Sequence, residues 1–513
     1  MLNRIFGKNV HTSLHVLGLC GVAFGIPLNK VVMSISMLFL ITNLLLESDF
    51  KTYWSNIKQH KIYRLIIIFF LFKLLSLAWT SNFDYAIHDF RVKLPLLAIA
   101  TALAVKPIIN RTHLQFILIA FVTSTVFVSL INFGMYQHWI GSRDYDDIRG
   151  MSIFSSHIRY ALTVTFSIGI LLNFFVHSRK YWPLLSVLIL WLTFYTYYSQ
   201  VITGYLTLTG ILFVFLIYKL WRSNRIIISS ISLVFIVLST FFILWVFTPI
   251  EINENDYKDL PRQTTKGAYY TNHFSVVSPV TEKPIYILVC ESELRSDWPT
   301  YSNIAFDSLD RKGQPIKSTI IRYLSSKDLT KDAEGLSKLA PEDVQSIENG
   351  EASYIKTGIM ARLYGIKFQL NNEGNPNNHS LLERFEYWKA GLSIVSRNYI
   401  MGVGVGDTDD AFKSYYKQSS TLLTEKNKHR SHNMYLTVFI TLGVVGISLF
   451  MAMHILFIQL NLKKKNVLAS AFIVVILLSF LIEDTLETQT GITFYALFFG
   501  LFFSTKHSKK LNE

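Results

Sequence analysis

The sequence predicts an all-α membrane protein with about twelve transmembrane helices and one large, mixed but mainly helical domain on the extracytoplasmic side. Hydrophobic residues make up 51% of the chain and charged residues only 16%, which is far from the balance of a soluble domain. Many apolar runs come close to or exceed the ~20 residues that a helix needs to cross a bilayer. One polar stretch of 186 residues, 248–433, separates nine of these runs from the last three.

Twelve apolar runs are predicted to span the membrane: 13–28, 31–46, 65–80, 94–110, 114–136, 158–176, 182–200, 202–218, 226–247, 434–460, 467–482 and 489–504. The alternative for the first pair is one re-entrant hairpin. No cleavable signal peptide is evident, because the first run lacks a small-residue cleavage site and leads into a second. We therefore expect three parts: helices one to nine (1–247), a loop domain (248–433), and helices ten to twelve with a short cytoplasmic tail (434–513).

The chain has a net charge of +14, and the placement of its basic residues indicates the topology in the membrane. The polar segment holds 23 Lys/Arg and 24 Asp/Glu, whereas the rest of the chain holds 26 Lys/Arg and 11 Asp/Glu. Most basic residues outside the polar segment lie at the termini and in alternate short connections: 47–64, 106–113, 177–181, 219–225 and 461–466. This asymmetry predicts cytoplasmic termini and an external polar segment after the ninth helix. It also argues against nucleic acid as a partner.

The polar segment combines a strand with several helices. Residues 284–290 are typical of a buried strand, and the pattern over 318–350 predicts helix, with Pro341 opening a new one. After Ser380, the expected N-cap, apolar residues recur at helical spacing: Leu382, Phe385, Trp388, Leu392 and Val395. This stripe either lies against the bilayer or the helix bundle, or packs into the core of the outer domain.

Glycine and cysteine patterns exclude two kinds of site. Gly402, Gly404 and Gly406 follow no strand of a βαβ unit, so we expect a backbone turn close to the substrate and not a nucleotide fingerprint. Cys20 lies in the first apolar run and Cys290 in the outer segment, so neither a disulfide nor a cysteine-based zinc site is expected.

The junction at 429–433 combines an imidazole, a guanidinium and an amide directly before an apolar helix. An imidazole titrates near neutrality, so His432 can accept a proton from a sugar hydroxyl that attacks an anomeric carbon. The alternative is a histidine that only caps the next helix at the interface. Asn433 is expected to orient the ring or the acceptor, or to cap that helix, and both roles are compatible. His429 is a weaker candidate.

Several cations are candidates for binding a diphosphate, because guanidinium forks bind phosphate oxygens bidentately. Arg384, beside the aromatic stripe, ranks before Arg397 and Arg430, and for each the alternative is a solvated surface residue. Arg159 lies just inside the outer end of the sixth helix and Lys73 near the middle of the third. A charge there needs an anionic partner, in the bundle or on a lipid diphosphate. For Arg159 the alternative is snorkelling to the headgroups.

Two short acidic clusters, 144–147 and 407–410, are possible metal sites. Paired carboxylates can hold Mg²⁺ or Mn²⁺ on a phosphate. Short acidic runs in loops are usually solvated, and we expect no metal.

Six segments, in this order and spacing, carry a family resemblance: Phe154 to Arg159, Ile202 to Gly204, Ser380 to Trp388, Gly402 to Asp407, Arg430 to Leu436 and Gly443 to Gly446. The chain resembles the O-antigen ligase and polymerase family of bacterial envelope enzymes over nearly its full length.

The resemblance implies a lipid-donor glycosyltransferase of GT-C-like architecture that works without metal, nucleotide sugar or cofactor. Its donor would be an undecaprenyl-diphosphate-linked glycan. The family's loop histidine maps to His432, its loop arginine to Arg384, and its membrane-embedded arginine to Arg159. Many members carry another arginine before helix eight, where this chain has Val201-Ile-Thr203. The second phosphate contact would then fall to Arg159 or Lys73.

We therefore expect an inner-membrane transferase that acts on the periplasmic face with His432 as general base, beside other envelope glycan assembly proteins. Three acceptors fit equally: lipid A core for a ligase, another lipid-linked repeat for a polymerase, and a protein hydroxyl for an O-oligosaccharyltransferase. A metal-dependent glycosyltransferase and a polysaccharide flippase or transporter are the alternatives. Sparse intramembrane charges and the large outer domain argue against a carrier.

Overall fold

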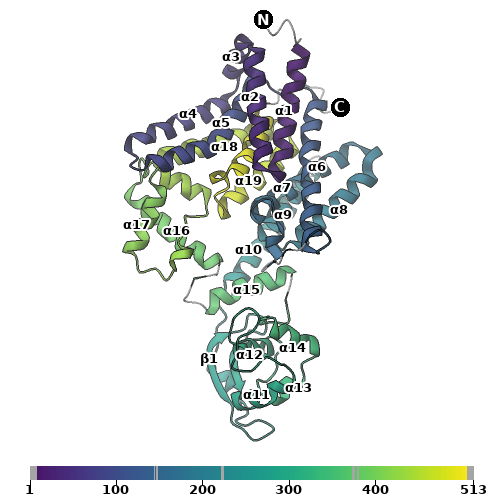
Figure 1. The fold of residues 1–513 in the computed structure, drawn as a ribbon, viewed down its shortest axis with the longest axis vertical. Helices are drawn as coiled ribbons and strands as arrows, with labels where there is room; N and C mark the ends of the chain where they lie inside the picture. Colours follow the sequence, from purple (N-terminus) through teal and green to yellow (C-terminus); the bar gives the residue numbers. More distant parts are fainter. Residues whose placement is uncertain are drawn as a thin grey trace. The chain divides into compact units, whose positions relative to one another are not determined.

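The computed structural model describes residues 8–141, 143, 145, 148–220, 225–356, 358–372, 376–377 and 380–504. The chain divides into two compact units, of which unit 1 comprises Met1–Ile228 with Arg384–Glu513 and unit 2 comprises Ser229–Glu383 (Figure 1). Residues 384–433, expected in the outer domain, thus group with the bundle.

Unit 1 is helical. Its helices are α1 (Lys8–Leu28), α2 (Lys30–Glu47), α3 (Phe50–Gln59), α4 (Lys61–Leu75), α5 (Phe83–Val105), α6 (Arg111–Tyr136), α7 (His157–His177), α8 (Trp182–Tyr198), α9 (Ile202–Leu220), α16 (Ser380–Arg397, from its second turn onward), α17 (Thr408–Gln418), α18 (Met434–Lys463), α19 (Val467–Ile482) and α20 (Gln489–Ser504).

Every run predicted to span the membrane forms a helix. Within the described residues, seven helical segments are long and apolar enough to cross a bilayer: Asn9–Leu28, Lys30–Glu47, Lys61–Trp79, Arg111–Tyr136, His157–His177, Ile202–Leu220 and Met434–Lys463. Val237–Phe247, α19 and α20 are apolar but shorter. A polytopic helical membrane protein is therefore supported, whereas twelve crossings and a GT-C architecture stay predictions.

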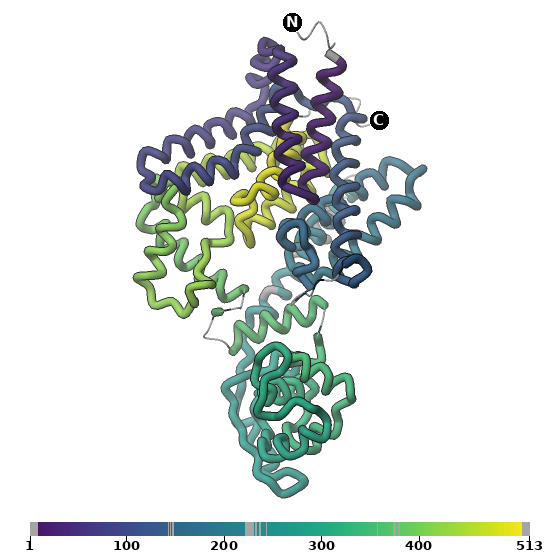
Figure 2. Tube along the Cα trace, in the orientation of Figure 1, coloured from purple at the N-terminus to yellow at the C-terminus, as the bar shows by residue number. Residues whose placement is uncertain are grey.

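The C-terminal helices form the centre of unit 1. All residues of α20 after Gln489 are buried, as expected for a helix that is apolar on every side. α20 packs on α1, α5, α18 and α19, and Figure 2 traces these yellow helices in among the purple and blue ones from the start of the chain. The ring of Phe498 lies 4.8 Å from that of Phe121, and Phe499 stacks on Phe457 at 4.3 Å.

α18 runs beside α4 for much of its length (Figure 1). Its 30 residues form two helical segments that meet at a kink at Gly443, where φ is +63°. The preceding loop pairs with this kink: Gly404 N–H donates to the carbonyl of Thr441 at 3.0 Å, and Val444 N–H donates to that of Tyr399 at 2.9 Å. A Cβ on Gly402 would lie 2.5 Å from the backbone of Thr441. These glycines serve backbone packing and do not line the cavity described below.

The predicted aromatic stripe on α16 is divided between two environments. Val395 is buried and packs, with Tyr387 and Ile394, against Phe412 of α17 and Ile440 of α18. Phe385 and Leu392 stay exposed. The helix therefore packs on the bundle by one face and leaves apolar residues on another.

Unit 2 has its own core, centred on buried side chains that include Trp298, Ile320 and Tyr323. β1 (Thr271–Val277) pairs antiparallel with β2 (Pro284–Val289), which confirms the predicted strand. The remaining elements are α10 (Arg225–Phe247, from Ser229 onward), α11 (Glu291–Asp297), α12 (Ile316–Ser326), α13 (Ala333–Ser337), α14 (Pro341–Glu348) and α15 (Gly358–Asn372). The helical pattern of 318–350 is thus split into three helices, since Asp332 caps one helix and Pro341 opens the next.

Candidate active site at the start of α18

A cavity of about 680 Å³ lies in unit 1 beside the start of α18. Its lining residues are Arg159, Asp409, Phe412, Lys413, Tyr416, Lys417, Glu425, Lys428, His429, Arg430, His432, Glu483, Asp484, Glu487 and Thr488. Three residues predicted from the sequence, Arg159, Arg430 and His432, are among them. Charged side chains of both signs dominate the wall, so the cavity suits a polar, ionic ligand.

The backbone before α18 is tightly held. The Asn433 side-chain oxygen accepts from the N–H of Leu436 at 3.0 Å, and its amide nitrogen donates to the Leu481 carbonyl at 3.0 Å. Asn433 is therefore the N-cap of α18 and also ties it to α19. His432 itself has φ +44°, a left-handed conformation that is unfavourable for a residue with a β-carbon. Such strain concentrates at functional positions.

The His432 ring lies between carboxylates and other rings. Its Nδ1 is 3.7 Å from Glu483 Oε2, too long for a hydrogen bond, and this buried nitrogen has no hydrogen-bond partner in the described part of the chain. Burial lowers the pKa of His432 to about 4; Asp484 opposes this shift and Arg384 adds to it. The ring is therefore neutral at pH 7, in the form that accepts a proton.

Arg159 approaches the same carboxylate from the first turn of α7. Its Nη2 lies 2.9 Å from Glu483 Oε1, so the anionic partner expected for this arginine is a residue of the bundle. Among the described residues, its buried Nε has no hydrogen-bond partner. Burial raises the pKa of Glu483, although Arg159 and Arg384 both counter the shift. One carboxylate thus faces the candidate base and a candidate phosphate-binding cation.

Arg430 is already engaged with anions. Its guanidinium donates to the Tyr85 hydroxyl at 2.6 Å and lies 3.3 Å from both Glu487 and Asp409. Burial alone would lower the pKa of Arg430, but Glu487 and the other anionic neighbours raise it above its usual value. The side chain is charged and fixed, and its carboxylate partners compete with any diphosphate.

A buried chain of alternating charge continues from Arg430 into the bundle. Glu487 lies 2.7 Å from Lys93, Lys93 also pairs with Asp89, and Asp89 is 2.5 Å from Lys73. The partner expected for Lys73 is therefore Asp89. Lys73 does not line the cavity; it pairs with Asp89, which also pairs with Lys93, the partner of Glu487.

Two predicted arginines lie on α16 outside the cavity wall. Arg384 Nε donates to the Ile482 carbonyl at 3.3 Å. Its charge is close enough to lower the pKa of both His432 and Glu483. Arg397 is exposed and 13 residues further along the helix, a distance of ~20 Å. The structure thus brings Arg384 near the site and leaves Arg397 away from it.

The acidic cluster at 407–410 is divided among different partners. Asp407 accepts hydrogen bonds from the backbone N–H groups of Ser81 and Asn82, and Asp410 accepts from the side chain of Asn82. Asp409 faces Arg430. Asp144, Asp146 and Asp147 lie outside the described residues. Among those that the structure describes, no group of three or more His, Cys, Asp or Glu side chains could hold a metal ion.

The acidic residues of this site were not predicted from the sequence. Glu483, Asp484 and Glu487 all fall in the six-residue connection between two apolar runs, on the side predicted for His432. Asp484 accepts from the Thr437 hydroxyl at 2.7 Å, and burial raises its pKa. The signal that could have identified them is the presence of three acidic residues in one short connection beside the membrane.

Comparison with known proteins bears on the same region. Residues 352–451, which include Arg384, Arg430 and His432, match a family model. That family is O-antigen ligase. The predicted resemblance to O-antigen ligases is confirmed over this segment, whereas Arg159 and the acids at 483–487 fall outside it. No curated protein matches the chain.

Proposed function

We propose that this membrane protein is a glycosyltransferase that moves a glycan from an undecaprenyl-diphosphate carrier to an acceptor hydroxyl, as an O-antigen ligase or polymerase. The observation that carries the proposal is the shared carboxylate of Glu483, whose two oxygens lie 2.9 Å from Arg159 and 3.7 Å from His432. A proton acceptor and a phosphate-binding cation thereby line one cavity of about 680 Å³.

In this proposal His432 takes the proton of the acceptor hydroxyl. The hydroxyl oxygen attacks the anomeric carbon, the new glycosidic bond forms, and the bond from that carbon to the diphosphate oxygen breaks. The diphosphate leaves with the electron pair, and the proton stays on the imidazole. A neutral ring is required, which agrees with a pKa lowered to about 4.

Arg159 would stabilise the charge that develops on the leaving diphosphate. Its buried Nε makes no hydrogen bond with any described residue and could donate to the diphosphate. The ion pair with Glu483 holds the guanidinium at the cavity wall. Glu483 would also accept a hydrogen bond from Nδ1 of His432 once the 3.7 Å gap closes around substrate, which would leave Nε2 as the base. Arg430 would contribute positive charge from the cavity wall, and Arg384 from outside it.

Basic residues in alternate connections support a location in the inner membrane, with the site on the periplasmic face. Accessibility labelling of a cysteine placed at position 432 tests this orientation, and labelling only from the cytoplasmic side would contradict it. A deletion strain separates the acceptors, since loss of glycan chain length indicates a polymerase and loss of attachment a ligase.

The central experiment replaces His432 with Ala in purified, reconstituted protein supplied with a lipid-linked glycan and an acceptor. Transfer should fall about 10²- to 10⁴-fold, the usual contribution of a general base. His429→Ala is the matched control, because this histidine lines the same cavity, and we expect it to retain most activity. Full transfer by a folded His432→Ala protein would falsify the general-base role. Transfer that survives excess chelator would support the metal-independent reaction.

A further inference from the structure

A second cavity, of about 440 Å³, lies in unit 1 at the far end of α18. Its lining residues are Gln59, His60, Lys61, Ile62, Leu456, Gln459, Leu460, Lys463, Lys464, Phe503 and Ser504. Three of them are lysines and none is a carboxylate. Lys61 and Lys463 make no ion pair with any described residue. These two lysines therefore carry positive charge that the described residues do not neutralise.

The wall of this cavity is amphipathic. Lys61 begins α4, and Lys463 and Lys464 end α18, whereas Ile62, Leu456, Leu460 and Phe503 supply an apolar surface. The ring of His60 packs edge-on against Phe503 at 5.7 Å. Burial lowers the pKa of Lys464, because it removes the ammonium group from water. A ligand with one anionic group and one apolar part fits both surfaces.

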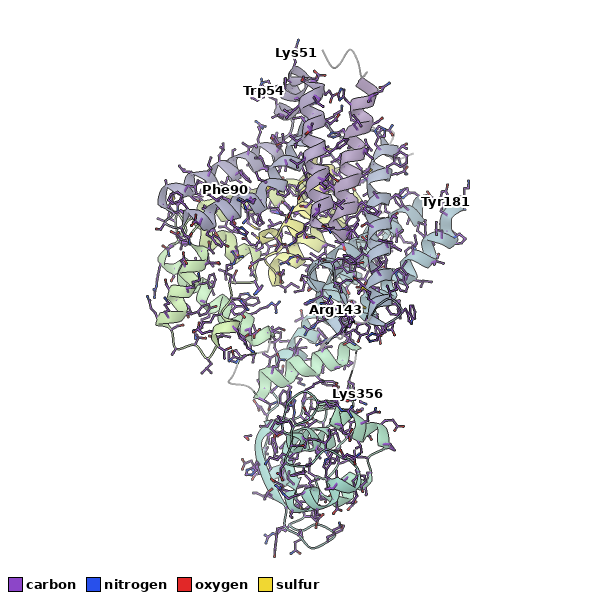
Figure 3. All side chains as sticks on the ribbon, in the orientation of Figure 1. Lys51, Trp54, Phe90, Arg143, Tyr181 and Lys356 are labelled. Carbon is purple, nitrogen blue, oxygen red and sulfur yellow. The ribbon has the colours of Figure 1, made fainter. Side chains whose placement is uncertain are left out.

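Helix α3 lies beside this cavity, because its last residue, Gln59, lines the wall. The character of α3 therefore indicates the depth of the cavity relative to the membrane. Trp54 of α3 is 62% exposed, Lys58 lies over its ring at 5.3 Å, and Figure 3 shows Trp54 and Lys51 together on this helix. A short amphipathic helix with an exposed tryptophan and lysines is typical of the headgroup region. We therefore expect the cavity to open at the level of the lipid phosphates.

We propose that this cavity binds the phosphate headgroup of an anionic phospholipid from the leaflet at this end of the bundle. Basic pockets between transmembrane helices are suited to such headgroups. The three lysines would hold the phosphate, and the apolar wall would contact the glycerol and upper acyl region. Free inorganic phosphate shares the charge but would leave the apolar wall uncovered, which favours the lipid.

The test uses the full-length protein in neutral detergent, where no membrane surface charge contributes. Native mass spectrometry counts bound lipids while phosphatidylglycerol, or phosphatidylcholine with the same acyl chains, is titrated. We expect one phosphatidylglycerol to bind in preference to phosphatidylcholine. The variant K61Q/K463Q/K464Q should lose about ten- to a hundred-fold in affinity, because three ion pairs with the phosphate are removed. Replacing the same lysines with arginine should preserve binding.

The matched control is K51Q/K180Q/K219Q, which removes equal charge from the same predicted face outside the cavity. It should bind phosphatidylglycerol as the unmodified protein does. An equal loss in both triple variants would overturn the site, because net charge would then explain binding. Displacement of the lipid by millimolar inorganic phosphate would overturn the assignment to a lipid. Glycan transfer enters none of these measurements, so they stand apart from the proposed reaction.

Discussion

The two cavities at the ends of α18 balance their charges in opposite ways. At the start of the helix, cations lie against carboxylates of the same chain: Arg159 is 2.9 Å from Glu483, and Arg430 is 3.3 Å from Glu487. At the far end, the described lining residues include three lysines and no carboxylate. Lys61 and Lys463 there make no ion pair with any described residue, so their charge is balanced by their surroundings.

This difference shows that the position of a charged side chain in the membrane decides which group neutralises it. A charge inside the bundle meets neither water nor headgroups, so the chain must supply the counter-charge. Near a lipid surface, phosphates can supply it instead. Internal pairing also suits a site that receives a diphosphate, since the ligand then exchanges one anion for another without exposing a bare cation.

The strongest test of the comparison removes Lys93 from the buried chain. Lys93→Met leaves Asp89 and Glu487 without their shared partner, and breaking a buried ion pair typically costs about 3–5 kcal/mol. Lys61→Met, at the other end of the bundle, should change the free energy of unfolding by no more than ~0.5 kcal/mol. Thermal unfolding in detergent measures both. Similar losses for the two variants would refute the contrast between the cavities.

A second test concerns Arg159, the cation whose Nε is available in the described structure. Arg159→Ala should reduce transfer about 10²- to 10³-fold, because one preorganised donor to a developing anion is lost. Arg159→Lys should recover little, since an ammonium lacks the planar fork. Lys413→Ala is the control: this residue lines the same cavity but is exposed. An equal fall for Lys413→Ala would mean that only the net charge of the cavity matters.

Particular residues show how far the sequence could predict this site. Lys73 and Arg159 were expected to need anionic partners, because their position in apolar helices demands them. The identity of those partners was not predictable, since Arg159 and Glu483 are 324 residues apart and meet only through packing of α7 against α19. Arg397 was expected, like Arg384, to be a candidate for binding the diphosphate, although a rise of ~1.5 Å per residue already separates the two by several turns. Local chemistry was thus predictable, and long-range pairing was not.

A smaller effect is expected at Asn433, whose capping and substrate-orienting roles were both predicted. Asn433→Ala should lower the free energy of unfolding by about 1 kcal/mol, the usual value of an N-cap, and Asn433→Ser should restore most of it. Unfolding and transfer are measured on the same preparations. If Ser restores stability while transfer stays lost, Asn433 orients the substrate in addition to capping α18.

The smallest effect at neutral pH should follow from Arg384→Gln. Transfer by the unmodified protein should be nearly constant around pH 7 and fall as the pH drops through the His432 pKa of about 4, where the base becomes protonated. Arg384 helps to lower that pKa, so its removal should raise it and move the acidic limb of the pH–rate profile to higher pH. Arg397→Gln, ~20 Å along the same helix, should leave the limb in place. A large loss of transfer at pH 8 in Arg384→Gln would instead assign this arginine to the diphosphate, and an unmoved limb would separate its charge from the base.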